Sequence, residues 1–128
     1  MGRMAYRYTQ ADVEAMSDAE LDKLAGFLQG WTIGGDCKAN NYWIDAEGEH
    51  TGLYVWWRMG RSYSPSHDRN RSGELLERLP VDFQIRRASE WQRVTVFGER
   101  LITVDGITAR AETIAAVCAL LALEGRLA

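Results

Sequence analysis

The sequence predicts an α+β fold, a three-layer α/β/α sandwich with a small antiparallel sheet and about three helices. Segments 17–30, 64–79 and 108–124 carry apolar residues at spacings of three and four, which mark the buried face of a helix. Segments 81–87 and 91–97 alternate apolar and polar residues, as half-buried strands do. Three amphipathic helices divided between the two faces of an antiparallel sheet are enough to cover it.

Length and composition indicate one domain with a real core. The chain has 128 residues, of which 46% are hydrophobic and 26% are charged. We expect a lead-in over residues 1–16 and a single domain over residues 17–128. The net charge of −3 argues against a general binder of polyanions.

The sequence also favours a cytoplasmic location. Its N-terminus has no apolar signal core, and no run approaches the ~20 residues of a membrane span. The two cysteines lie far apart, Cys37 in a polar loop and Cys118 in an apolar helical run. We therefore expect reduced thiols, with Cys118 buried and Cys37 reactive.

The first helix has a clear beginning and end. Ser17 and Glu20 form a capping box, Met16 and Leu21 occupy the positions of a hydrophobic staple, and Gly30 ends the helix. Within the lead-in before it, a turn of helix from Thr9 is a further expectation.

Residues 31–62 are irregular and rich in aromatic residues. Four of the five tryptophans fall here, at positions 31, 43, 56 and 57. The pattern indicates a strand at 42–45 and another over Leu53–Met59. The aromatic rings are either core or a ligand platform, and core is the commoner outcome because tryptophan is heavily buried on average.

The second helix is expected to begin at Ser64 and to run to Leu79. Ser64 is a suitable N-cap, Pro65 fits the first helical position, and Pro80 stops the helix. Ser66, His67 and Asp68 do not make a catalytic triad, because consecutive side chains on one turn diverge. A capped helix start is the simpler interpretation.

The second half is regular. A short hairpin loop at 88–90 joins the two alternating strands, and residues 100–104 favour a third strand. Asp105–Gly106 is typical of a turn, and Thr108 is a candidate cap for a last helix that ends at Gly125.

The best candidate for a binding surface surrounds the junction between the irregular region and the second helix. Arginine and aromatic side chains dominate interface hot spots, and they also stack on bases and pair with phosphates. The candidate binding residues are Trp56, Trp57, Arg58, Arg61, Tyr63, His67, Arg69 and Arg71. The alternative is a solvated arginine face that the acidic residues in 12–22 balance.

We expect no catalytic residues, no metal and no cofactor. Cys37, His50, His67 and Asp68 have spacings that match no zinc pattern. Gly34–Gly35 is not part of a phosphate-binding loop, and no G-x-S-x-G sequence is present.

The order of several short motifs resembles the phage ABA-sandwich domain family, small proteins of phages and prophages mostly without an assigned function. The matching segments are Gly30–Trp31, Tyr42–Trp43, Gly48, 63–68, 75–79, Trp91, Thr108–Ala109 and 114–118. In the family the central segment more often reads Tyr-Ser-Thr-Asp, whereas here Pro65 and His67 enter it. The resemblance implies a sandwich fold and a bacterial host cytoplasm.

Two classes of function follow. The first is a non-enzymatic phage or prophage accessory protein that binds a partner protein, for instance in host takeover or to block a defence system. The alternative is a module that contacts nucleic acid or a nucleotide through the arginine and aromatic surface. Neither class involves a membrane, and the oligomeric state stays open.

Overall fold

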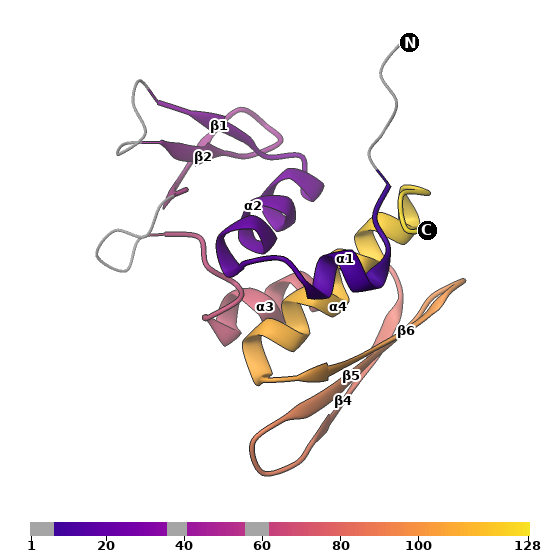
Figure 1. Cartoon of the computed structure of the whole chain (residues 1–128). Coiled ribbons are helices and arrows are strands. Elements are labelled where there is room, and N and C mark those ends of the chain that lie inside the picture. Colours follow the sequence, from indigo (N-terminus) through magenta and orange to yellow (C-terminus); the bar gives the residue numbers. More distant parts are fainter. Residues whose placement is uncertain (1–6, 36–40, 56–61) are drawn as a thin grey trace.

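The computed structural model describes residues 7–35, 41–55 and 62–128, which form helices and strands in mixed order (Figure 1). The helices are α1 (Gln10–Glu14), α2 (Asp18–Leu28), α3 (Arg69–Glu77) and α4 (Thr108–Leu123). The strands are β1 (Thr32–Gly34), β2 (Tyr42–Ile44), β3 (His50–Tyr54), β4 (Asp82–Arg87), β5 (Gln92–Phe97) and β6 (Leu101–Gly106). The predicted α+β class is confirmed.

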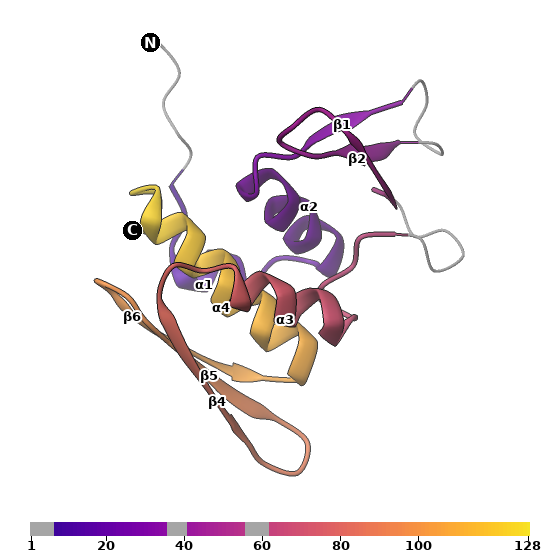
Figure 2. The same cartoon turned by 180° about the vertical axis from the view of Figure 1, so that it is seen from behind.

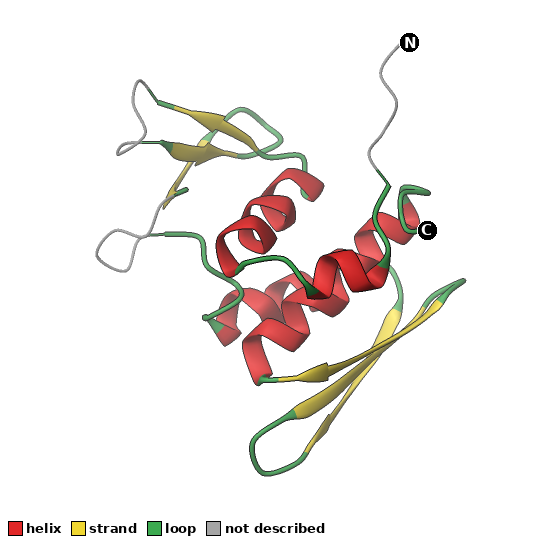
Figure 3. Cartoon of the chain, in the orientation of Figure 1, coloured by secondary structure: helices red, strands yellow, loops and turns green. Residues whose placement is uncertain are grey.

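The strands form two antiparallel sheets, one of β1–β2–β3 and one of β4–β5–β6, and the helices lie between them (Figures 2 and 3). We expected one sheet with helices on both faces, so the order of the layers differs from that expectation. The reason is that the two groups of strands bury different side chains. β2 packs Trp43 on α2, whereas β5 and β6 pack valines and an isoleucine on α4.

Helix α4 lies at the centre of the helix layer. Every residue from Ala111 to Ala119 is buried, and α1, α2, α3, β5 and β6 all contact this helix. Its alanines present little side-chain volume, so neighbouring elements can approach closely. A helix that is buried on all sides must be surrounded, which explains why elements from much of the chain pack around it.

The larger sheet buries one face. On β5 and β6 the inward side chains are Val94, Val96, Ile102 and Val104, each at most 1% exposed. The opposite face carries Arg93 and Asp105, which form a bidentate ion pair across the strands with atoms 2.7 and 3.0 Å apart. The predicted strands at 81–87 and 91–97 and the third strand are therefore confirmed, although the Asp105–Gly106 turn is wrong, because both residues pair with β5.

The smaller sheet is attached to α2 by Trp43, whose side chain is 1% exposed. The indole ring lies directly on Gly26, where a Cβ atom would stand 2.6 Å from the ring carbon Cη2 of Trp43. Phe27 and Trp31 contact the same ring, with centroids 5.3 and 5.9 Å away. For Trp43 the core interpretation is confirmed. β3 begins earlier than the predicted strand at 53–59, part of which lies outside the described residues together with Trp56 and Trp57.

Two helix starts agree with the sequence and two do not. The capping box of Ser17 and Glu20 is present, and Thr9 forms a second one with Asp12 at the start of α1. The predicted cap at Thr108 is wrong: α4 begins there, but Ile107 occupies the N-cap position and provides no side-chain hydrogen bond.

The predicted cap at Ser64 is also wrong. The amide groups of His67 and Asp68 both donate to the carbonyl of Ser64 in a separate turn, and α3 begins only at Arg69. Asp68 adopts an extended conformation (φ −115°, ψ 107°), which interrupts the helix, and its carboxylate accepts from the amide of Asn70 at 2.9 Å. Ser66, meanwhile, turns into the core to bond Asp22.

Tyr8, just before α1, is bonded to the end of the chain. The amide of Tyr8 donates to the carbonyl of Arg126, and that of Ala128 donates to the carbonyl of Tyr8. Val13 of α1 is fully buried beside α4.

Cys118 is buried as expected, and burial raises the pKa of its thiol to about 12. Cys37 lies outside the described residues. None of the helices in the described ranges is long and apolar enough to cross a membrane.

The contact between Trp43 and α2 predicts opposite effects for two helical glycines. Gly26→Ala should destabilise the protein by about 1–3 kcal/mol, because its methyl group overlaps the indole ring. Gly73→Ala on α3 meets no atom within 4 Å and should stabilise the protein by up to about 1 kcal/mol through helix propensity. Urea denaturation of both variants measures the difference, and a neutral Gly26→Ala would contradict the packing described.

The start of α3 predicts which residue caps it. Asp68→Ala should lower the free energy of unfolding by about 1 kcal/mol, because the amide of Asn70 loses its acceptor. Ser64→Ala should cost less, because the turn uses the backbone carbonyl of Ser64, and its hydroxyl bonds that of Ser62 and caps no amide of α3. The midpoints of chemical denaturation of the two variants measure the difference. A larger loss of stability in Ser64→Ala than in Asp68→Ala would place the cap at Ser64.

Candidate functional site

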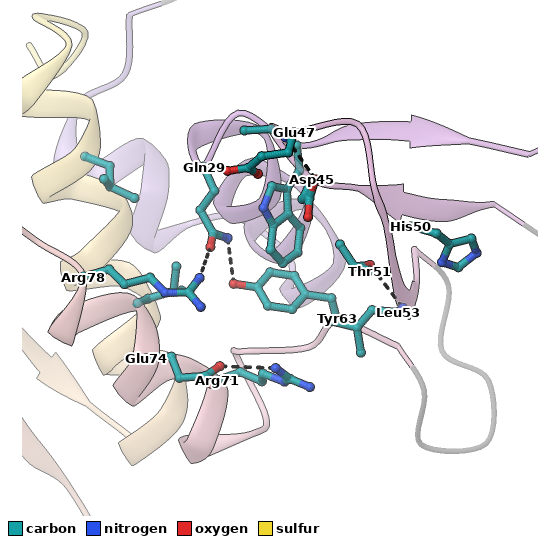
Figure 4. Close-up of a pocket in the computed structure, with 14 residues that line it drawn as sticks. Gln29, Asp45, Glu47, His50, Thr51, Leu53, Tyr63, Arg71, Glu74 and Arg78 are labelled. Carbon is teal, nitrogen blue, oxygen red and sulfur yellow. Dashed lines mark hydrogen bonds and ion pairs between the residues drawn. The ribbon is translucent and has the colours of Figure 1, made fainter.

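A cleft of about 740 Å³ separates α3 from the end of α2 and the turn between β2 and β3 (Figure 4). Its volume falls within the range of ligand sites. It is the best candidate for a functional site because charged side chains from two walls face an aromatic floor.

One wall is a single face of α3. Arg71, Glu74, Leu75 and Arg78 line it, at spacings of three and four residues that place them on one side of a helix. The guanidinium of Arg71 lies 3.2 Å from the carboxylate of Glu74. Arg78, at the C-cap of the helix, instead donates to the side-chain oxygen of Gln29 at 3.0 Å. Two cations and one anion thus line this wall.

The floor holds Tyr63, which is 3% exposed. Its hydroxyl oxygen accepts a hydrogen bond of 2.9 Å from the side-chain nitrogen of Gln29, which also donates to the carbonyl of Ala25. Trp31 packs on the phenol ring with centroids 4.8 Å apart. Burial raises the pKa of Tyr63 to about 12, against the lowering effects of the Gln29 hydrogen bond and of Arg78, so the phenol keeps its proton at neutral pH.

The opposite wall is the turn between β2 and β3. Asp45 accepts from the amides of Glu47 and Glu49 at 3.0 and 2.9 Å, which holds the turn, and Gly48 adopts a φ of +85° within it. Asp45 and Glu47 both line the cleft. Within the described ranges neither carboxylate forms an ion pair, so both remain available to a cation.

The structure divides the predicted surface residues. Tyr63 and Arg71 line the cleft together. Arg69 faces another side of α3, where its guanidinium lies 3.8 Å from the carboxylate of buried Glu112. His67 is exposed, with its Nε2 atom 3.0 Å from a carboxylate oxygen of Asp18. Trp56, Trp57, Arg58 and Arg61 lie outside the described residues.

Most of the cleft was not predicted from the sequence. The residues missed are Gln29, Trp31, Asp45, Glu47, Glu74 and Arg78. One signal was present in the sequence. Arg71, Glu74 and Arg78 share one helix face with the apolar Leu75, and this mixture indicates a charged face that is partly covered. No local pattern could show that the turn at 45–48 lies opposite this face.

A second polar cluster surrounds Ser66 and His67. Ser66 donates its backbone amide and its hydroxyl to buried Asp22, each at 2.9 Å. Asp18 pairs with His67 and also with Arg110. Serine and histidine therefore bond different carboxylates, and the imidazole does not lie between hydroxyl and carboxylate as a catalytic triad requires.

No group of three or more histidine, cysteine, aspartate and glutamate residues in the described part of the chain is arranged to hold a metal ion. In comparisons with known proteins, no family model matches the chain and no curated protein matches it.

The burial of Asp22 predicts a pH dependence of stability. Burial raises the pKa of this carboxyl from 3.8 to about 6, although hydrogen bonds from Ser66 oppose the shift. The folded state therefore holds its proton more tightly than the unfolded state. The resulting stability is present below about pH 4 and is lost as pH rises through about 6, by an amount on the order of 2 kcal/mol.

Asp22→Asn isolates this contribution. Between about pH 4 and about pH 7, the free energy of unfolding of the variant relative to wild type should rise by on the order of 2 kcal/mol. Urea denaturation of both proteins at the two pH values measures it. A difference that does not change with pH would show that Asp22 titrates as a solvated carboxyl does.

Proposed function

We propose that this protein is a non-enzymatic binding protein that holds a segment of a partner protein in the cleft between α3 and the β2–β3 turn. The observation that carries the proposal is the pairing of an arginine-bearing wall with an acidic wall above an aromatic floor. Arginine and tyrosine or tryptophan side chains in a partly closed recess are the usual anchors of protein interfaces.

The charges of the cleft favour a protein segment over nucleic acid. Asp45, Glu47 and Glu74 all line it, and their carboxylates would repel a chain of phosphates. A protein segment can present both signs of charge, so each wall can meet its complement. The net charge of −3 supports the same choice.

The biological setting is part of the proposal. The order of motifs from Gly30–Trp31 to the 114–118 helix resembles small phage and prophage proteins. We infer an accessory role in the cytoplasm of a bacterial host, in host takeover or against a defence system. Binding without catalysis suits such a role, because occupying a surface of a host protein is enough to block it.

Filling the cleft should abolish the capture of its partner. Ala46→Trp places an indole at the mouth of the cleft, on an exposed turn where substitutions change stability by no more than about 0.5 kcal/mol. Glu90→Trp, in the exposed hairpin loop of the larger sheet, adds the same side chain elsewhere. Pulldowns from bacterial lysate, with and without nuclease, compare both variants with wild type.

We expect proteins that wild type and Glu90→Trp capture and that Ala46→Trp does not, in nuclease-treated lysate as well. The affinity for the purified partner should change only moderately with salt. Retention of the same partners by Ala46→Trp would exclude the cleft. Loss of capture after nuclease treatment, with a steep fall of affinity as salt rises, would indicate nucleic acid instead.

A further inference from the structure

Arg78 is the cation of the cleft that is most open to a ligand. Its Nη1 atom donates to Gln29, and within the described part of the chain no carboxylate pairs with it. Arg71, in contrast, already pairs with Glu74. A guanidinium has five N–H donors in a planar fork. With one used by Gln29, the others can take a planar anion on two atoms at once.

A second donor lies beside Arg78. The hydroxyl oxygen of Tyr63 accepts from Gln29, but its hydrogen finds no acceptor among the residues that the structure describes. Tyr63 lines the cleft, so a ligand atom there can accept this hydrogen in place of water. Gln29 holds both groups, since its amide accepts from Arg78 and donates to Tyr63 (Figure 4).

We propose that the cleft recognises a mixed-charge protein segment, with a carboxylate of the segment held by Arg78 and the Tyr63 hydroxyl and a cationic side chain held by Asp45 and Glu47. This inference rests on the proposed function and names the chemistry of the partner. Trp31 and Leu53 also line the cleft and can contact apolar atoms of the segment.

The balance of charge selects this ligand. A carboxylate carries one negative charge and matches the fork of a single arginine. A phosphate group brings more negative charge toward Glu74, Asp45 and Glu47, and only the two arginines oppose it. A purely basic segment would bring no anion to Arg78 and no charged acceptor to the Tyr63 hydroxyl, so it would use only the acidic wall of the cleft.

The test selects binding peptides from a random peptide library on the immobilised protein. We expect the enriched peptides to carry an acidic residue, or to bind through the free C-terminal carboxylate, together with a basic residue. Their binding should be blocked by Ala46→Trp and kept by Glu90→Trp. Inorganic phosphate and a single-stranded oligonucleotide serve as competing probes and should not displace them at matched concentration.

Two substitutions then test the carboxylate subsite on a selected peptide. Arg78→Gln and Tyr63→Phe should each weaken binding, the first by about tenfold or more, because a hydrogen bond to a charged group is lost. Arg86→Gln removes an equal charge from the outer face of β4 and should leave affinity unchanged. Arg78 is exposed, so its variant is expected to fold, and thermal denaturation checks both.

The outcomes separate this inference from the proposed function. Two outcomes would overturn the carboxylate subsite and leave the cleft as a binding site. In the first, the peptides fail to bind Ala46→Trp but carry no acidic group. In the second, they bind Arg78→Gln as tightly as wild type. Peptides that bind Ala46→Trp unchanged would overturn both. If the oligonucleotide displaces the peptides and Arg78→Gln weakens its binding, the subsite would be assigned to phosphate and the inference would be overturned.

Discussion

The structure depends on the burial of one helix. α4 is covered along its central turns, and the continuous buried run from Ala111 to Ala119 leaves no face for water. Removing that surface from water requires neighbours on every side, so α1, α2, α3 and the larger sheet are all placed relative to α4. The segment before α1 also meets the segment after α4, where Tyr8 and Leu127 pair.

Glu112 fixes the orientation of α3 about its own axis. The carboxylate is 2% exposed, and it accepts from the hydroxyl of Ser72 and the side-chain amide of Gln92, each at 2.6 Å. A buried charge without such partners would be costly, so α3 must present Ser72 toward α4. The face about a third of a turn away then carries Arg71 and Arg78 into the cleft. Arg69 lies on another face, where its guanidinium is 3.8 Å from the carboxylate of Glu112.

The cleft is formed where the aromatic cluster meets that rotated helix. Trp43 fixes the smaller sheet on Gly26, and Trp31 and Tyr63 extend the cluster to the foot of α3. The rigid floor holds Gln29, which in turn positions Arg78 and the phenol of Tyr63. Binding groups held in this way lose little freedom when a ligand arrives, so more of the interaction energy appears as affinity. A binding role therefore fits the way the site is built.

The sequence by itself determined the helices and strands whose signals are local: the Ser17 capping box, the alternation of 82–87 and 92–97, and the apolar run of 108–123. These patterns act within a few residues, so they can be interpreted without the fold. Tertiary structure decided the rest. Asp68 rather than Ser64 caps α3 because the preceding turn sends Ser66 to Asp22. Arg71 joins the cleft and Arg69 does not because Glu112 sets the rotation of α3. The acidic turn at 45–47 lines the same cleft as Arg78 because Trp43 packs on α2, a contact between segments that no local pattern links.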